Sequence, residues 1–375
     1  YTVFLGKSEG NQHSKILVAR SVDCGATWSK PVKITESYNL NQGATVAVDP
    51  GTGAVYVAWQ VFVSNSDPAS IMIVKSTDGG KSFGKAVRVA RTRPFNQGTR
   101  PVSADDPFRL FRTNAYPTLA VDDKGRVYAA WSERGYWGKD NIDPKDGYAD
   151  GSRIVVTSST NGGQTWANRY AADTSDAASR GHHIMPSLGY AAGKLTLLFY
   201  DFRDDYYPVL FDGILANWNQ PSLLPYERSM PPADAAAFDP LPIRHTVEVR
   251  TAAADATGNA PAKFDGSSLR ASRYLSTFVL DTSNHYQALQ LQSNQVNLPI
   301  FSGGTSPFIG DYIEIAASPQ FIPDPNNAGK WIYNNASADA SVFHAVWTDN
   351  RNVMPPPAQK DINGNLMRSD WTKYS

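Results

Sequence analysis

The hydrophobic residues of this chain recur in short runs that alternate with polar residues, as they do in half-buried β-strands. Residues 44–49 (ATVAVD) and 54–59 (AVYVAW) flank a Gly-Thr-Gly turn, and residues 116–122 (YPTLAVD) and 126–131 (RVYAAW) flank Asp-Lys-Gly. Such runs, joined by turns of this composition, predict antiparallel hairpins. Helical periodicity is nearly absent, so the pattern predicts an all-β fold.

An eight-residue motif occurs three times, each time after an apolar run. It reads SVDCGATW at residues 21–28, STDGGKSF at 76–83 and STNGGQTW at 159–166. The preceding runs are KILVAR, IMIVK and RIVVT. A recurring hairpin motif indicates a repeat architecture.

The repeating unit consists of four strands, with the motif between the third and the fourth. The clearest units span residues 43–90 and 116–172. Partial units are predicted at the N-terminus, from Met185 onward, over residues 272–301 and from residue 310 to the end. The pattern predicts one domain over residues 1–375, with six units and an insertion at about 204–242 in the fourth. The first and last units are expected to be incomplete, or completed by strands from both termini.

Each position of the motif has a structural role. The acidic or amide side chain accepts hydrogen bonds from its own turn, the glycine adopts a positive φ, and the aromatic ring packs under the turn. These positions are Asp23, Asp78 and Asn161, then Gly25, Gly80 and Gly163, and finally Trp28, Phe83 and Trp166. A calcium role is the weaker alternative, because one copy carries a neutral asparagine.

The three motifs resemble the Asp-box (BNR) repeats of the sialidase-like superfamily. The stretches SRYL, NLPIF, PFIGDYIEIA and HAVWTDNR are also similar to those of uncharacterised bacterial secreted sialidase-like proteins. The resemblance covers nearly the whole chain. It implies a six-bladed β-propeller of four-stranded antiparallel blades, in a secreted, extracellular or cell-surface protein.

Charged residues gather at the strand ends opposite the motif. In an antiparallel unit, the start of strand one and the end of strand two lie at the same end, and the motif lies at the other. The candidates after strand two are Glu133, Arg134, Asp201, Arg203, Asp349 and Arg351; those near the start of strand one are His183, Asp311 and Tyr312; Arg244 follows the insertion.

Two interpretations of these charges remain open. Arginines bind carboxylates bidentately, and Asp201, Asp311 or Glu133 could act as acid and base. The sialidase resemblance implies an arginine trio, for which Arg134, Arg203 and Arg351 are candidates, and a tyrosine nucleophile, for which Tyr312 is one. The alternative is that a repeated aromatic–acid–arginine pattern forms structural ion pairs between blades.

The composition argues against several classes of partner and site. The chain has 35 Lys and Arg against 35 Asp and Glu, which argues against nucleic acid or an anionic membrane as the main partner. Cys24 is the single cysteine, so an internal disulfide is excluded, and its thiol is expected to be buried. No cofactor motif occurs. Structural calcium is a weak alternative at Asp140, Asp143 and Asp146, where a solvated loop is favoured because EF-hand spacing is lacking.

Three functions follow. The first is a binding or assembly module for a glycan or an extracellular protein. The second is an exo-glycosidase of sialidase type that acts on terminal acidic sugars. The third is a purely structural subunit of an extracellular assembly.

Overall fold

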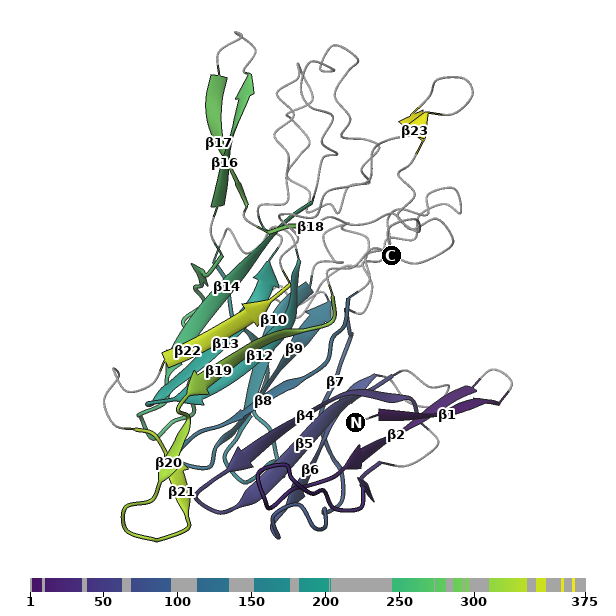
Figure 1. Cartoon of the computed structure of the whole chain (residues 1–375), viewed down its shortest axis with the longest axis vertical. Coiled ribbons are helices and arrows are strands. Elements are labelled where there is room, and N and C mark those ends of the chain that lie inside the picture. Colours follow the sequence, from purple (N-terminus) through teal and green to yellow (C-terminus); the bar gives the residue numbers. More distant parts are fainter. Residues whose placement is uncertain are drawn as a thin grey trace.

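The structure is a computed structural model. It describes residues 2–8, 11–35, 39–62, 69–95, 113–134, 152–175, 182–201, 203, 245–272, 274–280, 286–292, 294–296, 310–335, 342–348, 359–360 and 366–367. Every regular element in these ranges is a β-strand, and all pairings between named strands are antiparallel (Figure 1), so the predicted all-β class is confirmed for this part of the chain. None of it forms a helix of the length and apolarity needed to cross a membrane.

Two complete four-stranded sheets match the two clearest units. The second sheet contains β4 (Asn41–Asp49), β5 (Ala54–Val61), β6 (Ser70–Ser76) and β7 (Val87–Arg91), and the third contains β8 (Thr118–Val121), β9 (Val127–Arg134), β10 (Ser152–Ser159) and β11 (Tyr170–Ala171). In both sheets the strands pair in the order of the sequence. Alternation with turn residues therefore predicted these hairpins correctly.

The remaining strands form one three-stranded sheet, one larger sheet and several pairs. The first sheet contains β1 (Thr2–Ser8), β2 (Asn11–Val18) and β3 (Val32–Lys33); the fourth contains β12 (His183–Ala191), β13 (Lys194–Asp201), β14 (His245–Asp255) and β15 (Leu269–Arg270), with β18 (Asn294–Val296) also on β14. The pairs are β16 (Tyr274–Leu280) with β17 (Tyr286–Gln292), β19 (Ile313–Ser318) with β22 (Val342–Trp347), β20 (Phe321–Pro323) with β21 (Trp331–Tyr333), and β23 (Gln359–Lys360) with β24 (Leu366–Met367).

Within the described residues, the predicted fifth unit does not form a four-stranded sheet of its own. Strand β19 packs directly beside β12, and the Ile315 amide donates to Ser187 Oγ at 3.0 Å. Strand β18 joins the beginning of β14 instead of a separate blade. Strand β19 lies beside β12 because of apolar contact: Ile313 and Ile315 share a buried cluster with Ile184 of β12. A closed ring of six blades remains a prediction.

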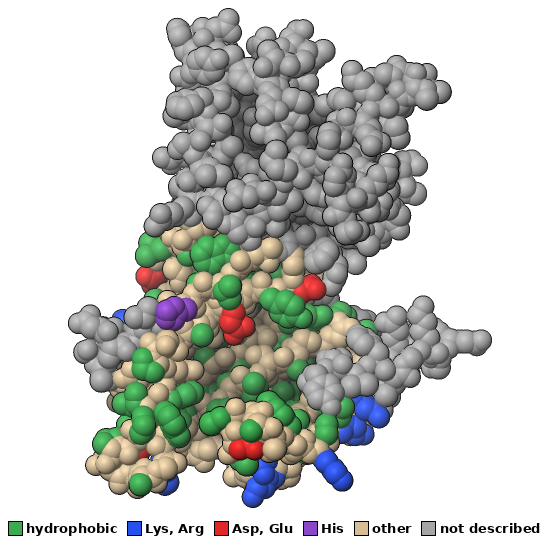
Figure 2. Space-filling view, viewed as in Figure 1, with side chains coloured by type: hydrophobic (Ala, Val, Ile, Leu, Met, Phe, Trp, Pro, Cys, Tyr) green, Lys and Arg blue, Asp and Glu red, His purple; other side chains and the backbone are tan. Residues whose placement is uncertain are grey.

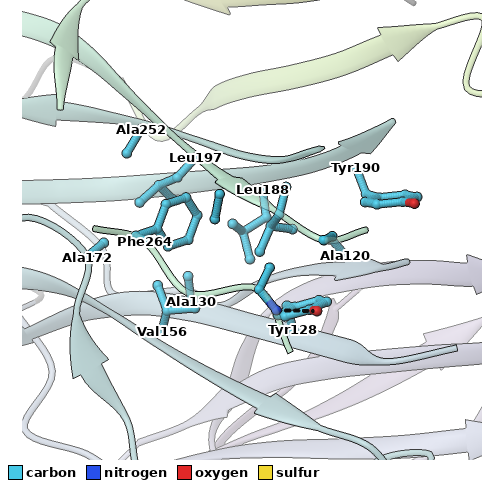
Figure 3. Packing of buried hydrophobic residues seen from close by; sticks show 14 of the residues in the cluster. Ala120, Tyr128, Ala130, Val156, Ala172, Leu188, Tyr190, Leu197, Ala252 and Phe264 are labelled. Carbon is cyan, nitrogen blue, oxygen red and sulfur yellow. Dashed lines mark hydrogen bonds between the residues drawn. The ribbon is translucent and has the colours of Figure 1, made fainter. Parts of the chain in front are cut away.

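The apolar core lies between neighbouring sheets. Figure 3 shows Tyr128 and Val156 of the third sheet facing Leu188 and Leu197 of the fourth, with Phe264 between them. The Tyr128 hydroxyl also accepts a hydrogen bond from the Ala262 amide at 2.9 Å. Burial of each large side chain contributes about 1.5–3 kcal/mol, so these interfaces bind the sheets to one another.

The three motifs form the predicted hairpin turns. In the second copy, Ser82 N donates to Asp78 Oδ1 at 3.0 Å and Gly80 N donates to Ser76 Oγ at 2.8 Å. The same pair of bonds occurs in the first and third copies. The three motif glycines have φ values of 88°, 82° and 83°. The predicted roles of the acidic, amide and glycine positions are therefore confirmed.

The aromatic position behaves as predicted in two copies. Phe83 packs against a cluster that contains Ile16 of the first sheet, and Trp166 packs against a cluster that contains Ile73 of the second. Each ring thus packs against a cluster that its own sheet shares with the preceding sheet. The prediction is wrong for Trp28, which is 65% exposed, because among the described residues no sheet precedes the first. Cys24 is also exposed, contrary to expectation, since it occupies a turn position with a φ of 55°.

The hairpin of β20 and β21 links the C-terminal ends of the first strands of the second, third and fourth sheets. The Tyr333 hydroxyl donates to Val121 O at 2.6 Å and lies 3.4 Å from Val48 O. Its ring meets that of Tyr190 edge-on, with centroids 5.0 Å apart. One side chain therefore joins the ends of β4, β8 and β12.

Candidate functional site

At the strand ends opposite the motif, hydrogen bonds join strands of different sheets. Met185 N donates to Ser132 Oγ at 3.1 Å, which joins the start of β12 to the end of β9. Thr348 N donates to the Tyr200 hydroxyl at 2.9 Å, directly after β22 and near the end of β13. Strands β13 and β22 also point toward the same end of the molecule in Figure 1. We call this the charged end, and the other the motif end.

Arg203 lies at the centre of a buried ion-pair network. Its Nε and Nη2 donate to Asp201 Oδ2 at 3.0 and 2.6 Å, and Nη2 also donates to Asp173 Oδ2 at 2.6 Å. All three side chains are at most 5% exposed. Because Asp173 follows the third sheet and Asp201 ends β13 of the fourth, Arg203 joins the two sheets.

Glu248 extends this network along β14. It is fully buried and accepts from Arg250 Nη1 at 2.7 Å and from Arg270 Nε. Arg203 Nε lies 3.8 Å from Glu248 Oε1. Each buried carboxylate therefore has arginine partners, as buried charges require.

The network shifts the pKa values of its members. Burial raises the pKa of Asp201, and the pairing with Arg203 opposes that rise. Burial alone would lower the pKa of Arg203, but hydrogen bonds to Asp201 and then Asp173 raise it above its ordinary value. For Asp173, bonds from Ser268 and Arg203 outweigh burial and lower the pKa. Arg203 is thus a cation whose Nε and Nη2 are already bonded to Asp201 and Asp173.

The pKa values of His182 and His183 both lie below the ordinary value of histidine. Burial, followed by the charges of Arg153 and Arg134, lowers the pKa of His182 to about 3. Burial and then Arg153 also lower the pKa of His183 well below 6.5, although its Nε2 lies 3.1 Å from Asp201 Oδ2. Within the described ranges, no group of three His, Cys, Asp or Glu side chains is placed to hold a metal ion.

Glu133 belongs to a second ion pair, inside the third sheet. Its Oε2 accepts from Trp131 Nε1 at 3.0 Å, and its Oε1 accepts from Arg169 Nη2 at 2.8 Å. Glu133 is only 2% exposed. For Glu133, as for Asp201 and Arg203, the contacts are those expected of structural ion pairs.

Arg134 is partly buried and packs on an aromatic ring. Its Nε donates to Pro94 O at 3.2 Å, and its guanidinium carbon lies 4.6 Å from the centroid of Phe95. The Phe95 ring in turn lies 4.6 Å from that of His182. Arg134 therefore belongs to a different group of residues from Arg203.

Among the predicted site residues that the structure describes, Tyr312 is the most exposed. It precedes β19 and is 82% exposed, while its neighbour Asp311 is partly buried. Asn114 Nδ2 donates to Asp311 O at 3.1 Å, so the start of β19 is tied to the segment before β8. The remaining candidates lie outside the described residues: Arg244, Asp349, Arg351, Asp140, Asp143, Asp146 and the predicted insertion at 204–242.

Sequence reasoning missed a buried arginine at the motif end. Arg126 donates to Asp122 through Nε, to Gly258 O at 2.9 Å through Nη1, and to Ala256 O at 2.5 Å through Nη2. It joins the turn between β8 and β9 to the segment after β14. The Asp-x-x-x-Arg spacing across this turn was the available signal. Asp173 and Glu248 carried no comparable local signal.

Comparisons with known proteins found weak structural similarity. No family model and no curated protein matches the sequence. An α-L-arabinofuranosidase of Fusarium graminearum is 14% identical, with 99% of this chain and 88% of that chain covered and a TM-score of 0.39. The sialidase of Trypanosoma rangeli is 11% identical, covering 86% and 49%, with a TM-score of 0.31. An endo-arabinanase of Bacillus licheniformis is 11% identical, covering 80% and 94%, with a TM-score of 0.32.

Proposed function

We propose that this chain is an extracellular glycan-binding module whose charged end is the recognition surface. The proposal rests on the Asp-box resemblance for the class of protein and on the contacts at this end for the mode of action. The residues assigned to recognition are Arg134, Asp311 and Tyr312, each of which is at least partly exposed. No cofactor is required.

One observation carries the choice of binding over catalysis. Asp201 is 0% exposed and Glu133 is 2% exposed, and each is held by an arginine. A general acid or base must reach the proton that it transfers. Both carboxylates are instead occupied by structural partners. In Figure 2 exposed Lys and Arg side chains lie along the lower edge of the described part, whereas Arg203 is buried inside it.

Tyr312 is suited to recognition. Its ring offers an apolar face and its hydroxyl offers a polar group, a combination that is enriched at binding surfaces. Because the side chain is 82% exposed, its removal is expected to leave the folded core unchanged. The effect of a substitution can therefore be assigned to binding.

The test is a glycan microarray, followed by titration of the best-bound glycan. Tyr312→Ala is expected to weaken binding at least about tenfold, in the range of an interface hot spot. Trp331→Ala is the matched control, because this aromatic residue is 55% exposed and lies in the β20–β21 hairpin at the motif end. The proposal fails when the wild-type protein binds no glycan, or when both substitutions have equal effects.

The exo-glycosidase alternative retains one specific observation. Tyr312 is accessible beside Asp311, the arrangement in which a tyrosine could act on a substrate. A fluorogenic sialoside separates the two functions. Release of the fluorophore by the wild-type protein, with loss of that activity in Tyr312→Phe, would replace the binding proposal by the enzymatic one.

A further inference from the structure

We propose that water molecules are bound inside the protein, between the second and third sheets, by the amide of Gln60 and the hydroxyl of Thr92. This inference is independent of the glycan proposal. It begins with Gln60, which directly follows the apolar run AVYVAW in β5 and is 0% exposed.

Neither polar atom of the Gln60 amide has a hydrogen-bond partner within the described part of the chain. The same holds for the hydroxyl of Thr92, a residue that is 8% exposed. An uncompensated buried polar group costs about 1–3 kcal/mol, and an amide has both a donor and an acceptor to satisfy. Three buried polar atoms without protein partners therefore indicate an occupant that both donates and accepts.

The strand register places Gln60 and Thr92 on the same face of the second sheet. Gln60 is opposite Ile71 across β5 and β6, and Ile71 is opposite Ala90 across β6 and β7. Thr92 follows Ala90 by two residues and donates its amide hydrogen to Ala69 O at 2.8 Å, which continues the ladder. Side chains two residues apart on a strand share a face.

That face is covered by the third sheet. Ile71 belongs to a buried apolar cluster that also contains Ala58, two residues before Gln60, and Trp131 and Val155 of the third sheet. The Gln60 amide thus lies at the charged end of an otherwise apolar interface between the sheets.

Residues 92–95 close this end of the interface. They leave β7 and reach the end of β9, where Arg134 N donates to Arg93 O at 2.8 Å and Pro94 forms a bridge with Glu133. Because Gln60 is completely buried, the occupant beside its amide must be small. Water meets the requirement, since buried waters typically make two to four hydrogen bonds to otherwise unsatisfied groups.

The hydration site supports the residues that hold Arg134. Both backbone and side chain of Arg134 bond to the crossing, through Arg93 O and Pro94 O. Thr92 anchors the same crossing at its start. Water bound to the Thr92 hydroxyl therefore contacts the residue at which this crossing begins.

The decisive experiment is a double-mutant cycle with Gln60→Leu and Thr92→Val. Each single substitution removes one partner of the water and is expected to lower Tm by about 1–3 °C. The loss of Tm in the double variant should be smaller than the sum of the two single losses, because it removes both polar partners together. Gln42→Leu is the control, because the Gln42 amide accepts directly from the Tyr116 hydroxyl at 3.0 Å and should add independently to Thr92→Val.

The opposite sign overturns the inference. If the amide has no occupant, Gln60→Leu removes an unsatisfied group and raises Tm. A crystal structure of the wild-type protein tests the same point without any variant. Ordered water within hydrogen-bonding distance of Gln60 Oε1 and Nε2 supports the proposal, and a dry site or a rotated amide that bonds to protein refutes it.

Discussion

Acidification from pH 7 to pH 5 is expected to destabilise the fold through His182. The side chain is 8% exposed, and burial, followed by Arg153 and Arg134, lowers its pKa from 6.5 to about 3. The unfolded chain therefore takes up a proton below pH 6.5 that the folded chain does not accept until about pH 3. Because the unfolded state binds more protons in this window, the free energy of unfolding falls as the pH falls.

The two pKa values set the size of the effect. With 6.5 in the unfolded chain and about 3 in the folded chain, linkage gives a loss of about 2 kcal/mol between pH 7 and pH 5. A loss of this size is a large part of the stability of a typical domain. His183 acts in the same direction, since burial also lowers its pKa.

Urea denaturation at pH 7, 6 and 5, followed by tryptophan fluorescence, measures the loss. His182→Asn is the appropriate variant, because its side-chain oxygen can accept the Ser152 amide as His182 Nδ1 does at 3.4 Å. Because the variant keeps His183, the difference between the two proteins reports His182 alone. Between pH 7 and pH 5 the variant should lose about 2 kcal/mol less of its free energy of unfolding than the wild type. Equal losses in the two proteins would refute the assignment.

Two further substitutions test how the sheets are joined. Trp166→Ala should lower the free energy of unfolding by about 2 kcal/mol. Trp28→Ala, at a site that is 65% exposed, should change it by less than about 0.5 kcal/mol. Similar losses for the two variants in urea denaturation would contradict the packing of the motif on the preceding sheet. Arg126→Ala leaves Asp122 buried without its cation and should cost about 3–5 kcal/mol, with Arg126→Lys recovering only part of the loss. A loss below about 1 kcal/mol for Arg126→Ala would show that the ion pair does not hold the third and fourth sheets together.

The hairpin motif could be predicted from the sequence because its bonds are local. Ser76 and Asp78 are two residues apart, and the remaining bonds of this turn span at most four. Alternation likewise predicted most strands of the second and third sheets. The exposure of Trp28 could not be predicted in this way, because it depends on whether another sheet precedes the first.

The charged end was only partly predictable, for the opposite reason. Arg203 and Asp173 are 30 residues apart, and the two oxygens nearest to Arg203 belong to Asp201, at the end of β13, and to Asp173, which follows the third sheet. Sequence showed that charges gather after strand two, but it could not show which of them neutralise one another. The position of β19 beside β12 depends on a contact between Ile315 and Ser187, which are 128 residues apart.

The link made by Tyr333 has a consequence for the order in which the protein folds. Its partners, Val121 and Val48, precede it by 212 and 285 residues. During synthesis the second and third sheets can form from local hairpins, but this link must wait until Tyr333 has been made. Strand β12 also remains uncovered on one side until β19 arrives. Apolar surface exposed in such intermediates promotes aggregation, so the last contacts to form determine when a newly made chain is protected from it.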